Sequence, residues 1–259
     1  MFSTNFHFGG ISNVDYGIYL VRTSNNMVSS PYVPAREIKE DFPFNARQPF
    51  HYGVQDQPQT IVLTFSSLEN DMDSDKLTSI TNWLFSNEYK EFYSDDNTNK
   101  IYYLISIGET PLISTVNNEG YIEVRFRSKF PYALTTASTP TYDSLYDYYQ
   151  ILPVTKFTIN NACNVFEYFY PVYEITIGAT PTEIYLYNWE TEQEVLFDEL
   201  QSGEVLYVDN QKKTIISSTS NYKYDSFNRE WFKFIQGDNL IEIGGVCTIE
   251  FSLQYPVFT

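Results

Sequence analysis

Cysteine is scarce in this sequence. The 259 residues include two cysteines, Cys163 and Cys247, which lie far apart in the chain. Two thiols at this separation are too few for a disulfide framework or a four-ligand zinc cluster. We expect both to be buried free thiols in a protein that is made in a reducing cytoplasm.

Basic residues and long apolar runs are also scarce. Lysine and arginine total 16 against 33 Asp and Glu, which gives a formal net charge of −17 and a pI near 4.4. This balance argues against a surface that binds nucleic acid or an anionic membrane. The sequence contains no run of about 18 apolar residues, so we expect no transmembrane helix. The first six residues lack the basic and apolar segments of a signal peptide.

Signals of catalysis are missing too. The sequence has no nucleophile elbow, phosphate-binding loop or metal dyad, and its two histidines are His7 and His51. Paired carboxylates would serve a glycoside hydrolase, but among 33 acidic residues no motif selects a pair. We therefore expect no enzyme activity, no catalytic residues, no cofactor and no metal site.

Alternating carboxylates at Asp71, Asp73 and Asp75 raise the question of a calcium site. An EF-hand loop starting at Asp71 needs glycine at its sixth position and glutamate at its twelfth. Those positions hold Lys76 and Asn82. Capping of a helix and interaction with its dipole explain the carboxylates more simply.

Aromatic residues, in contrast, are abundant, with 23 Tyr and 20 Phe. They occur with β-branched residues in short alternating segments, and turn signals separate these segments at intervals of about ten residues, as in β-sandwiches. Pro131 and the Thr/Ser-rich stretch after it interrupt the pattern. We predict a mostly β protein with two β-sandwich-type domains, residues 1–135 and 136–259.

One α-helix is predicted in the first domain. Asp73 or Ser74 provides the N-cap, and Leu77, Ile80 and Trp83 then recur on one helical face. We expect this helix to pack on the strands of its domain.

An aromatic segment between two strands, residues 42–52, is the second special feature of this domain. Its aromatic residues and its arginine are Phe42, Phe44, Arg47, Phe50 and Tyr52. So many rings in a hairpin expose apolar surface unless something covers them. The segment either packs on its own domain or contacts another subunit, and these five residues are the candidate subunit interface.

Several segments of the first half occur in a characteristic order. They are Phe8–Ser12, Asp15–Tyr19, Glu37–Gln59, Thr60–Phe65, Trp83–Leu84, Lys100–Tyr103 and Phe130–Ala133. In this order they resemble the N-terminal domain of the distal tail proteins (Dit) of long-tailed bacteriophages. The resemblance implies a ring-forming belt domain with a protruding hairpin that embraces a neighbouring subunit.

The second half carries a matching set of segments. They are Tyr170–Ile175, Gly203–Asp209, Trp231–Phe232 and Gly237–Ile241. They are similar to the galectin-like C-terminal β-sandwich of the same family. Galectins hold sugars with a histidine-containing cluster and a tryptophan; this half has no histidine, although Trp189 and Trp231 are possible platforms. A carbohydrate-binding module for cell-surface glycans is therefore the alternative function.

The resemblance implies a structural role in the tail tip or baseplate of a phage virion. A hub of this kind forms a hexameric ring and joins the tail tube protein to tail-associated, tail fibre or receptor-binding proteins. DNA passes through the ring without sequence-specific binding, and no membrane is a partner. The resemblance also implies assembly in the cytoplasm of the bacterial host.

Overall fold

The computed structural model describes residues 5–21, 33–44, 47–67, 74–114, 120–144, 154–179, 183–219 and 223–258. The chain divides into two compact units, Met1–Thr136 with Val257–Thr259, and Ala137–Pro256. The sequence predicts a second domain of residues 136–259, but the end of the chain returns to the first unit. Val257 is buried in the core of the first unit.

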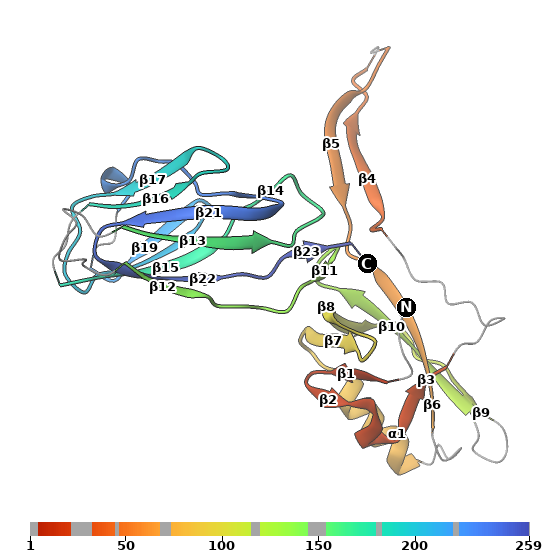
Figure 1. Ribbon diagram of the computed structural model, residues 1–259. Coiled ribbons are helices and arrows are strands. Elements are labelled where there is room, and N and C mark those ends of the chain that lie inside the picture. Colours follow the sequence, from red (N-terminus) through yellow and green to blue (C-terminus); the bar gives the residue numbers. More distant parts are fainter. Residues whose placement is uncertain are drawn as a thin grey trace. The chain divides into compact units, whose positions relative to one another are not determined.

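In its described residues, the first unit is built from strands with one α-helix and a short 3₁₀-helix (Figure 1). Its elements are β1 (Phe6–Phe8), β2 (Ile11–Ser12), η1 (Asn13–Tyr16), β3 (Ile18–Leu20), β4 (Arg36–Asp41), β5 (Phe50–Asp56), β6 (Thr60–Ser67), α1 (Ser74–Leu84), β7 (Lys90–Ser94), β8 (Asn97–Ile107), β9 (Leu112–Ser114), β10 (Gly120–Ser128) and β11 (Ala133–Leu134). The order of the main sheet is β2-β1-β7-β8-β10-β6-β3.

Alternation along β6 and β10 gives this sheet one apolar face. Val124 of β10 pairs with Leu63 of β6, and Phe126 pairs with Ile61. All four side chains are buried, because successive residues of a strand point to opposite faces and directly paired residues share a face. The opposite face of the same strands carries the intervening residues.

The helix α1 covers the apolar face, as its sequence periodicity predicts. Ile80, Trp83 and Leu84 are buried. The indole Nε1 of Trp83 donates a hydrogen bond of 2.9 Å to the carbonyl oxygen of Phe8. Tyr16 stacks on the Trp83 ring with the two centroids 4.3 Å apart. The prediction of one packed helix is therefore confirmed.

Two residues that the sequence singled out lie outside the described residues. They are Asp73, one of the two proposed N-cap residues, and Asp71 of the rejected calcium pattern. Asp75 lies in the first turn of α1, where a carboxylate interacts favourably with the helix dipole.

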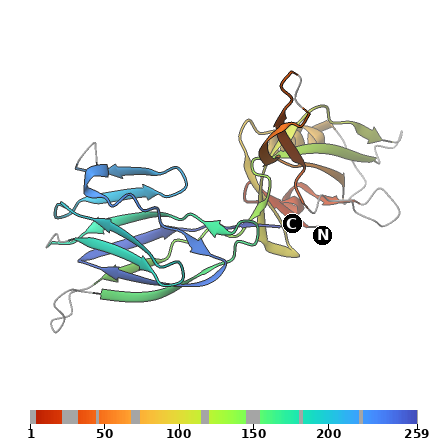
Figure 2. The same cartoon turned by 90° about the horizontal axis from the view of Figure 1, so that it is seen from above.

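The second unit is a β-sandwich. Its elements are β12 (Thr141–Ser144), β13 (Val154–Asn161), β14 (Tyr168–Phe169), β15 (Val172–Ile177), β16 (Ile184–Asn188), β17 (Gln193–Phe197), β18 (Val205–Asp209), β19 (Thr214–Ser217), η2 (Tyr224–Ser226), β20 (Phe234–Ile235), β21 (Gly237–Gly244) and β22 (Cys247–Ser252). The last strand, β23 (Pro256–Val257), begins at the end of this unit and pairs with β11. Its strands run alongside one another in both views (Figures 1 and 2).

Two sheets of the second unit enclose one core. The first has the order β12-β22-β15-β18-β19 and the second the order β13-β21-β16-β17. Their inner residues, such as Ile175, Leu206, Leu186 and Ile241, are fully buried in a single cluster. The prediction of a mostly β chain is confirmed.

Both cysteines are buried and free, as expected. Within the described residues, no helix combines the length and the apolar character that are needed to cross a membrane.

Candidate subunit interface

The predicted aromatic segment forms a β-hairpin of the first unit. β4 and β5 pair as a separate two-stranded sheet (Figure 1). Ile38 lies opposite Val54, and Asp41 lies opposite Phe50. An isolated two-stranded hairpin is marginally stable in water, because it lacks a third strand or a packed layer.

A β-bulge interrupts the hairpin ladder. Lys39 pairs with Gly53 and Glu40 pairs with His51, so Tyr52 is the extra residue of β5. Gly53 has a φ of 125°, a value that strains any residue with a side chain. The bulge therefore depends on this glycine, and it sets the direction in which Tyr52 leaves the strand.

Apolar side chains of the hairpin are exposed in the single chain. The exposed fraction is 64% for Phe42, 95% for Phe44, 61% for Phe50 and 70% for Tyr52. Ile38 and Val54 are more than half exposed as well, although they lie outside the predicted set of interface residues. Contiguous apolar surface of this kind marks a contact site in soluble proteins.

The base of the hairpin is fixed to its own unit. Tyr132 donates a hydrogen bond to the carboxylate of Asp56, and the Arg36 Nε atom lies 3.0 Å from the Asp56 Oδ1 atom. Just beyond β5, the Gln59 Nε2 atom donates to the carbonyl oxygen of Pro131 at 2.6 Å. The hairpin is thus anchored at one end and uncovered along its length.

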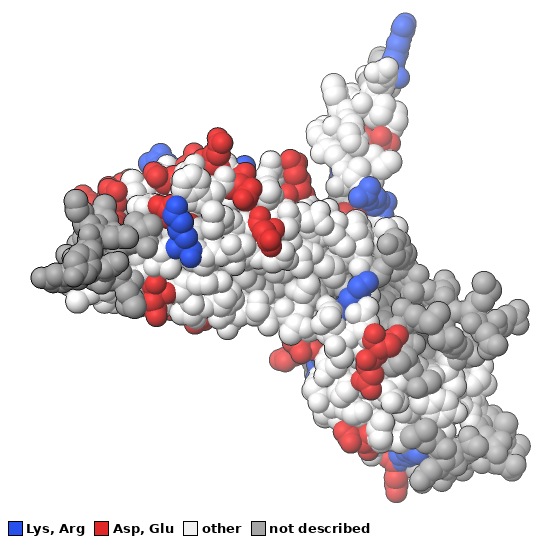
Figure 3. Space-filling model, viewed as in Figure 1, with Lys and Arg blue, Asp and Glu red and all other residues white. Residues whose placement is uncertain are grey.

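Charges on the hairpin lie beside its aromatic rings. Figure 3 shows the hairpin largely white, with blue atoms at its far end, and Arg47 is an exposed residue of the loop between β4 and β5. Lys39 pairs with Glu37 at 2.5 Å. Glu40 and Asp41 are exposed, and neither forms an ion pair with any residue that the structure describes.

All five predicted interface residues therefore lie on this hairpin, and all five are exposed. Phe42, Phe44 and Arg47 belong to the connecting loop, and Phe50 and Tyr52 belong to β5. The sequence left open whether these rings pack on their own unit or contact another subunit. In the structure the rings are exposed and do not pack on their own unit. Contact with another subunit remains a proposal.

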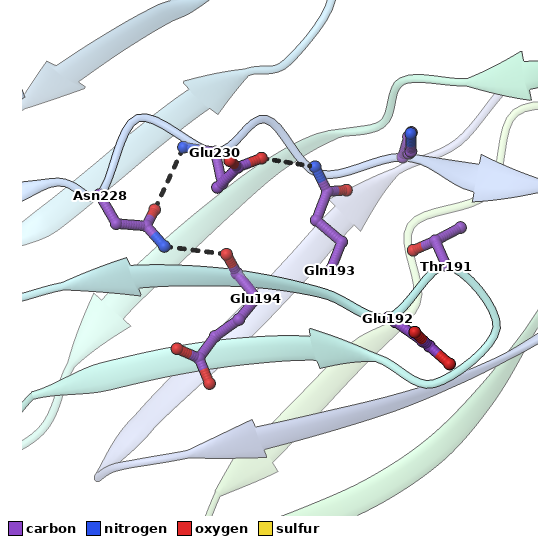
Figure 4. Close-up of a pocket in the computed structure, with 7 residues that line it drawn as sticks. Thr191, Glu192, Gln193, Glu194, Asn228 and Glu230 are labelled. Atoms are coloured by element: carbon purple, nitrogen blue, oxygen red, sulfur yellow. Dashed lines mark hydrogen bonds between the residues drawn. The ribbon is translucent and has the colours of Figure 1, made fainter.

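The second unit contains a polar pocket of about 430 Å³ (Figure 4). It is lined by Thr191, Glu192, Gln193, Glu194, Asn228, Glu230 and Lys233. The lining is bonded to itself, since Asn228 donates to the Glu194 carbonyl oxygen at 2.9 Å and Gln193 donates to Glu230 at 3.2 Å. In the part of the chain that the structure describes, no group of three His, Cys, Asp or Glu residues is arranged to hold a metal ion.

The two tryptophans that were considered as sugar platforms differ in exposure. Trp231 packs against the core, whereas Trp189 is 47% exposed. The Trp189 Nε1 atom donates to Glu242 at 3.0 Å, and the Lys156 amine lies 4.6 Å from the centre of its ring. Burial would raise the pKa of Glu242, but hydrogen bonds from Lys156, Tyr185 and Trp189 outweigh burial and lower it. Trp189 is thus engaged in an internal cluster, which does not favour a sugar site.

Comparison with protein families gives matches in both halves. Residues 1–129 match a family described as phage tail protein N-terminal domain, and residues 141–253 match one described as phage tail C-terminal domain. The SPbeta prophage-derived protein YomH of Bacillus subtilis (strain 168) is 27% identical over 256 residues, which are 98% of this chain and 97% of that protein.

Comparison with solved structures gives the fold. The Dit protein of phage SPP1, described as a paradigm of the hub adsorption apparatus in phages that infect Gram-positive bacteria, matches with a TM-score of 0.64 at 9% identity, over 96% of this chain and 98% of that one. A chain of the phage p2 baseplate in its activated conformation with strontium matches with a TM-score of 0.48 at 8% identity, over 98% of this chain and 99% of that one.

These matches establish the class of protein. The chain belongs to a family of phage tail proteins, and its fold is that of a distal tail protein.

Proposed function

We propose that the protein is the distal tail hub of a phage and that its copies form a ring, with six subunits as in the family it resembles. The ring joins the tail tube to the proteins that attach the phage to its host. The exposed aromatic hairpin is the observation that carries this proposal, because a two-stranded ribbon with uncovered rings gains stability when another subunit covers it.

The contact within such a ring is heterologous. Each subunit offers its hairpin to one neighbour and a different surface to the other neighbour, and a closed ring results when the rotation between subunits closes. The second unit then serves as a platform for adhesion proteins. With a net charge of −17 per subunit, the ring repels rather than binds DNA that passes through it.

Replacement of Phe50 and Tyr52 by serine tests the proposal. The wild-type protein should form a species of six times its 30.2 kDa mass in mass photometry. The double variant should remain folded but monomeric, because large rings at the centre of an interface contribute most of its binding energy.

A matched control comes from the second unit. Ile216 and Tyr207 are exposed neighbours on paired strands, with exposed fractions of 62% and 38%. Their replacement by serine should leave the ring intact. A wild-type protein that stays monomeric, both alone and in purified tails, contradicts the proposed ring, and so does a hairpin variant that assembles normally.

A further inference from the structure

The second unit contains a pocket that is lined mainly by aromatic rings. Its volume is about 490 Å³, which lies within the range of about 300–1,000 Å³ that is typical of small-ligand sites. We call it the aromatic pocket. Its lining residues are Phe166, Tyr168, Phe169, Tyr170, Asn210, Gln211, Lys213 and Pro256. Trp189 and Trp231 are not among these residues, so the pocket is distinct from both tryptophans.

Four rings from one short segment form the apolar part of the pocket. Phe166 and Tyr170 are 49% and 38% exposed. Phe169 packs against the core of the unit, and its ring centroid lies 4.7 Å from that of Tyr255. The strand β14, which holds Tyr168 and Phe169, pairs with β20. The segment is thus anchored through Phe169 and presents other rings to the solvent.

The polar groups of the pocket come from the turn between β18 and β19. The Asn210 Nδ2 atom donates to the Pro171 carbonyl oxygen at 2.6 Å, and the Asn210 Oδ1 atom accepts from the Phe232 N–H at 2.8 Å. These bonds fix the start of the turn. Gln211 and Lys213 are exposed, and their side chains can therefore reach a ligand in the pocket. A site whose walls are fixed before binding loses less entropy when the ligand enters.

The charges around the pocket narrow the class of ligand. Aromatic cages often hold organic cations, but Lys213 lines this pocket and the Lys233 amine lies 4.3 Å from the centre of the Tyr168 ring. No Asp or Glu is among the lining residues, so a cation would meet only like charge. The net charge of −17 repels large anions at longer range. A neutral ligand fits these conditions best.

A hexopyranose sugar has the chemistry that the pocket requires. The C–H groups on one face of its ring pack on aromatic side chains, and its hydroxyl groups exchange hydrogen bonds with amides and amines. An entirely apolar ligand would bury the polar ends of Gln211 and Lys213 without partners, which is costly.

We propose that the aromatic pocket binds a short neutral glycan of hexopyranose units. Phe166 and Tyr170 are its stacking platforms, and Gln211 and Lys213 donate hydrogen bonds to its hydroxyl groups. This activity belongs to the second unit and does not depend on the proposed ring.

A glycan microarray that is probed with the full chain tests the proposal, followed by titration calorimetry with the neutral glycan that binds most strongly. Tyr170→Ala should weaken binding by about tenfold or more, because the sugar loses the apolar surface that covers it. Gln211→Ala should weaken it by about threefold to tenfold, as expected for the loss of one hydrogen bond.

Tyr207→Ala is the matched control. Tyr207 is also 38% exposed, and it lies on β18 of the same unit without lining the pocket. Its replacement should leave the affinity unchanged. Circular dichroism of each variant should match that of the wild type, which separates lost binding from lost folding.

Three outcomes overturn the proposal. The first is a wild-type chain that binds no neutral glycan on the array. The second is binding that Trp189→Ala abolishes and Tyr170→Ala does not, since the sugar would then lie outside the pocket. The third is a decaproline peptide that displaces no glycan but itself binds through Tyr170, which would make the pocket a peptide groove. Mass photometry of Tyr170→Ala should show the same species as the wild type, so none of these outcomes bears on the ring.

Discussion

At the scale of single residues, Lys223 and Glu204 form a deeply buried ion pair. Their side chains are 6% and 0% exposed, with a separation of 3.4 Å. Glu204 also accepts hydrogen bonds from the Ser217 hydroxyl at 2.6 Å and the Gln201 N–H at 2.9 Å. Lys223 donates to the Glu199 carbonyl oxygen at 2.7 Å. The pair therefore ties together loops that are distant in sequence.

Substitution of Lys223 by methionine should destabilise the second unit by ~3–5 kcal/mol at neutral pH, because it leaves a buried carboxylate without its cation. Urea denaturation measures the change. Lys213→Met is the control, since Lys213 is exposed in the same unit and should change stability by no more than ~0.5 kcal/mol. Equal effects of the two substitutions would contradict a special role for the buried pair.

The cost of this substitution should depend on pH. Burial alone would raise the pKa of Glu204, but hydrogen bonds from Ser217 and Gln201 and the charge of Lys223 outweigh it and hold the pKa below the usual 4.5. A depressed pKa gives stability that is present above the unfolded value and is lost as the pH falls through the folded value. The difference between wild type and Lys223→Met should therefore shrink in acid, and a difference that is constant with pH would argue against this account.

At the scale of elements, Gly244 shows how one strand depends on its neighbour. Gly244 of β21 lies opposite Tyr185 of β16, and a Cβ atom at Gly244 would collide with the Tyr185 ring. The ring lies across the glycine, and the Tyr185 hydroxyl reaches Glu242 at 2.9 Å. A glycine in a strand interior often marks such a close approach.

Gly244→Ala should cost ~1–3 kcal/mol of stability, because the added methyl group forces the Tyr185 ring to move. In a Tyr185→Ser background the same alanine should cost little, since the ring is gone. Thermal denaturation of the four proteins in this double-mutant cycle gives the coupling. Additive effects of the two substitutions would mean that the ring does not constrain position 244.

The sequence predicts elements whose signals are local. The spacing of Ile80 and Trp83 predicts α1, a nearly continuous run of apolar and β-branched residues predicts β6, and alternation predicts β10. The sequence singles out the aromatic segment that contains Phe42 and Phe50, but it leaves open whether the rings pack on their own domain, and their exposure comes from the structure. The row of Val62 and Arg125 on β6 and β10 does not follow in this way, because it exists only through the pairing of distant strands. Likewise, no local signal joins Lys223 to Glu204.

At the scale of the whole molecule, two cores are described, one in each unit. Calorimetry should therefore resolve two unfolding transitions, since domains with separate cores violate two-state behaviour. Lys223→Met should lower one transition. Trp83→Phe, which removes the hydrogen bond to Phe8, should lower the other. One transition that both variants shift equally would mean that the units unfold together.

The division of the chain was predicted from Pro131 and the Thr/Ser-rich stretch after it, which are local signals. The burial of Val257 in the first unit has no counterpart in the sequence, because a short apolar segment does not reveal which core it joins. The proposed ring and its contact surfaces also depend on a neighbour, which the sequence of one subunit does not contain.

The return of Val257 has a mechanical consequence. The backbone passes between the units twice, once after Thr136 and once after Pro256. A pull on the second unit is therefore carried by one covalent linker and, through the second crossing, by the noncovalent burial of Val257 in the core of the first unit. A force that pulls Val257 out of that core would leave the linker after Thr136 as the connection that bears the load.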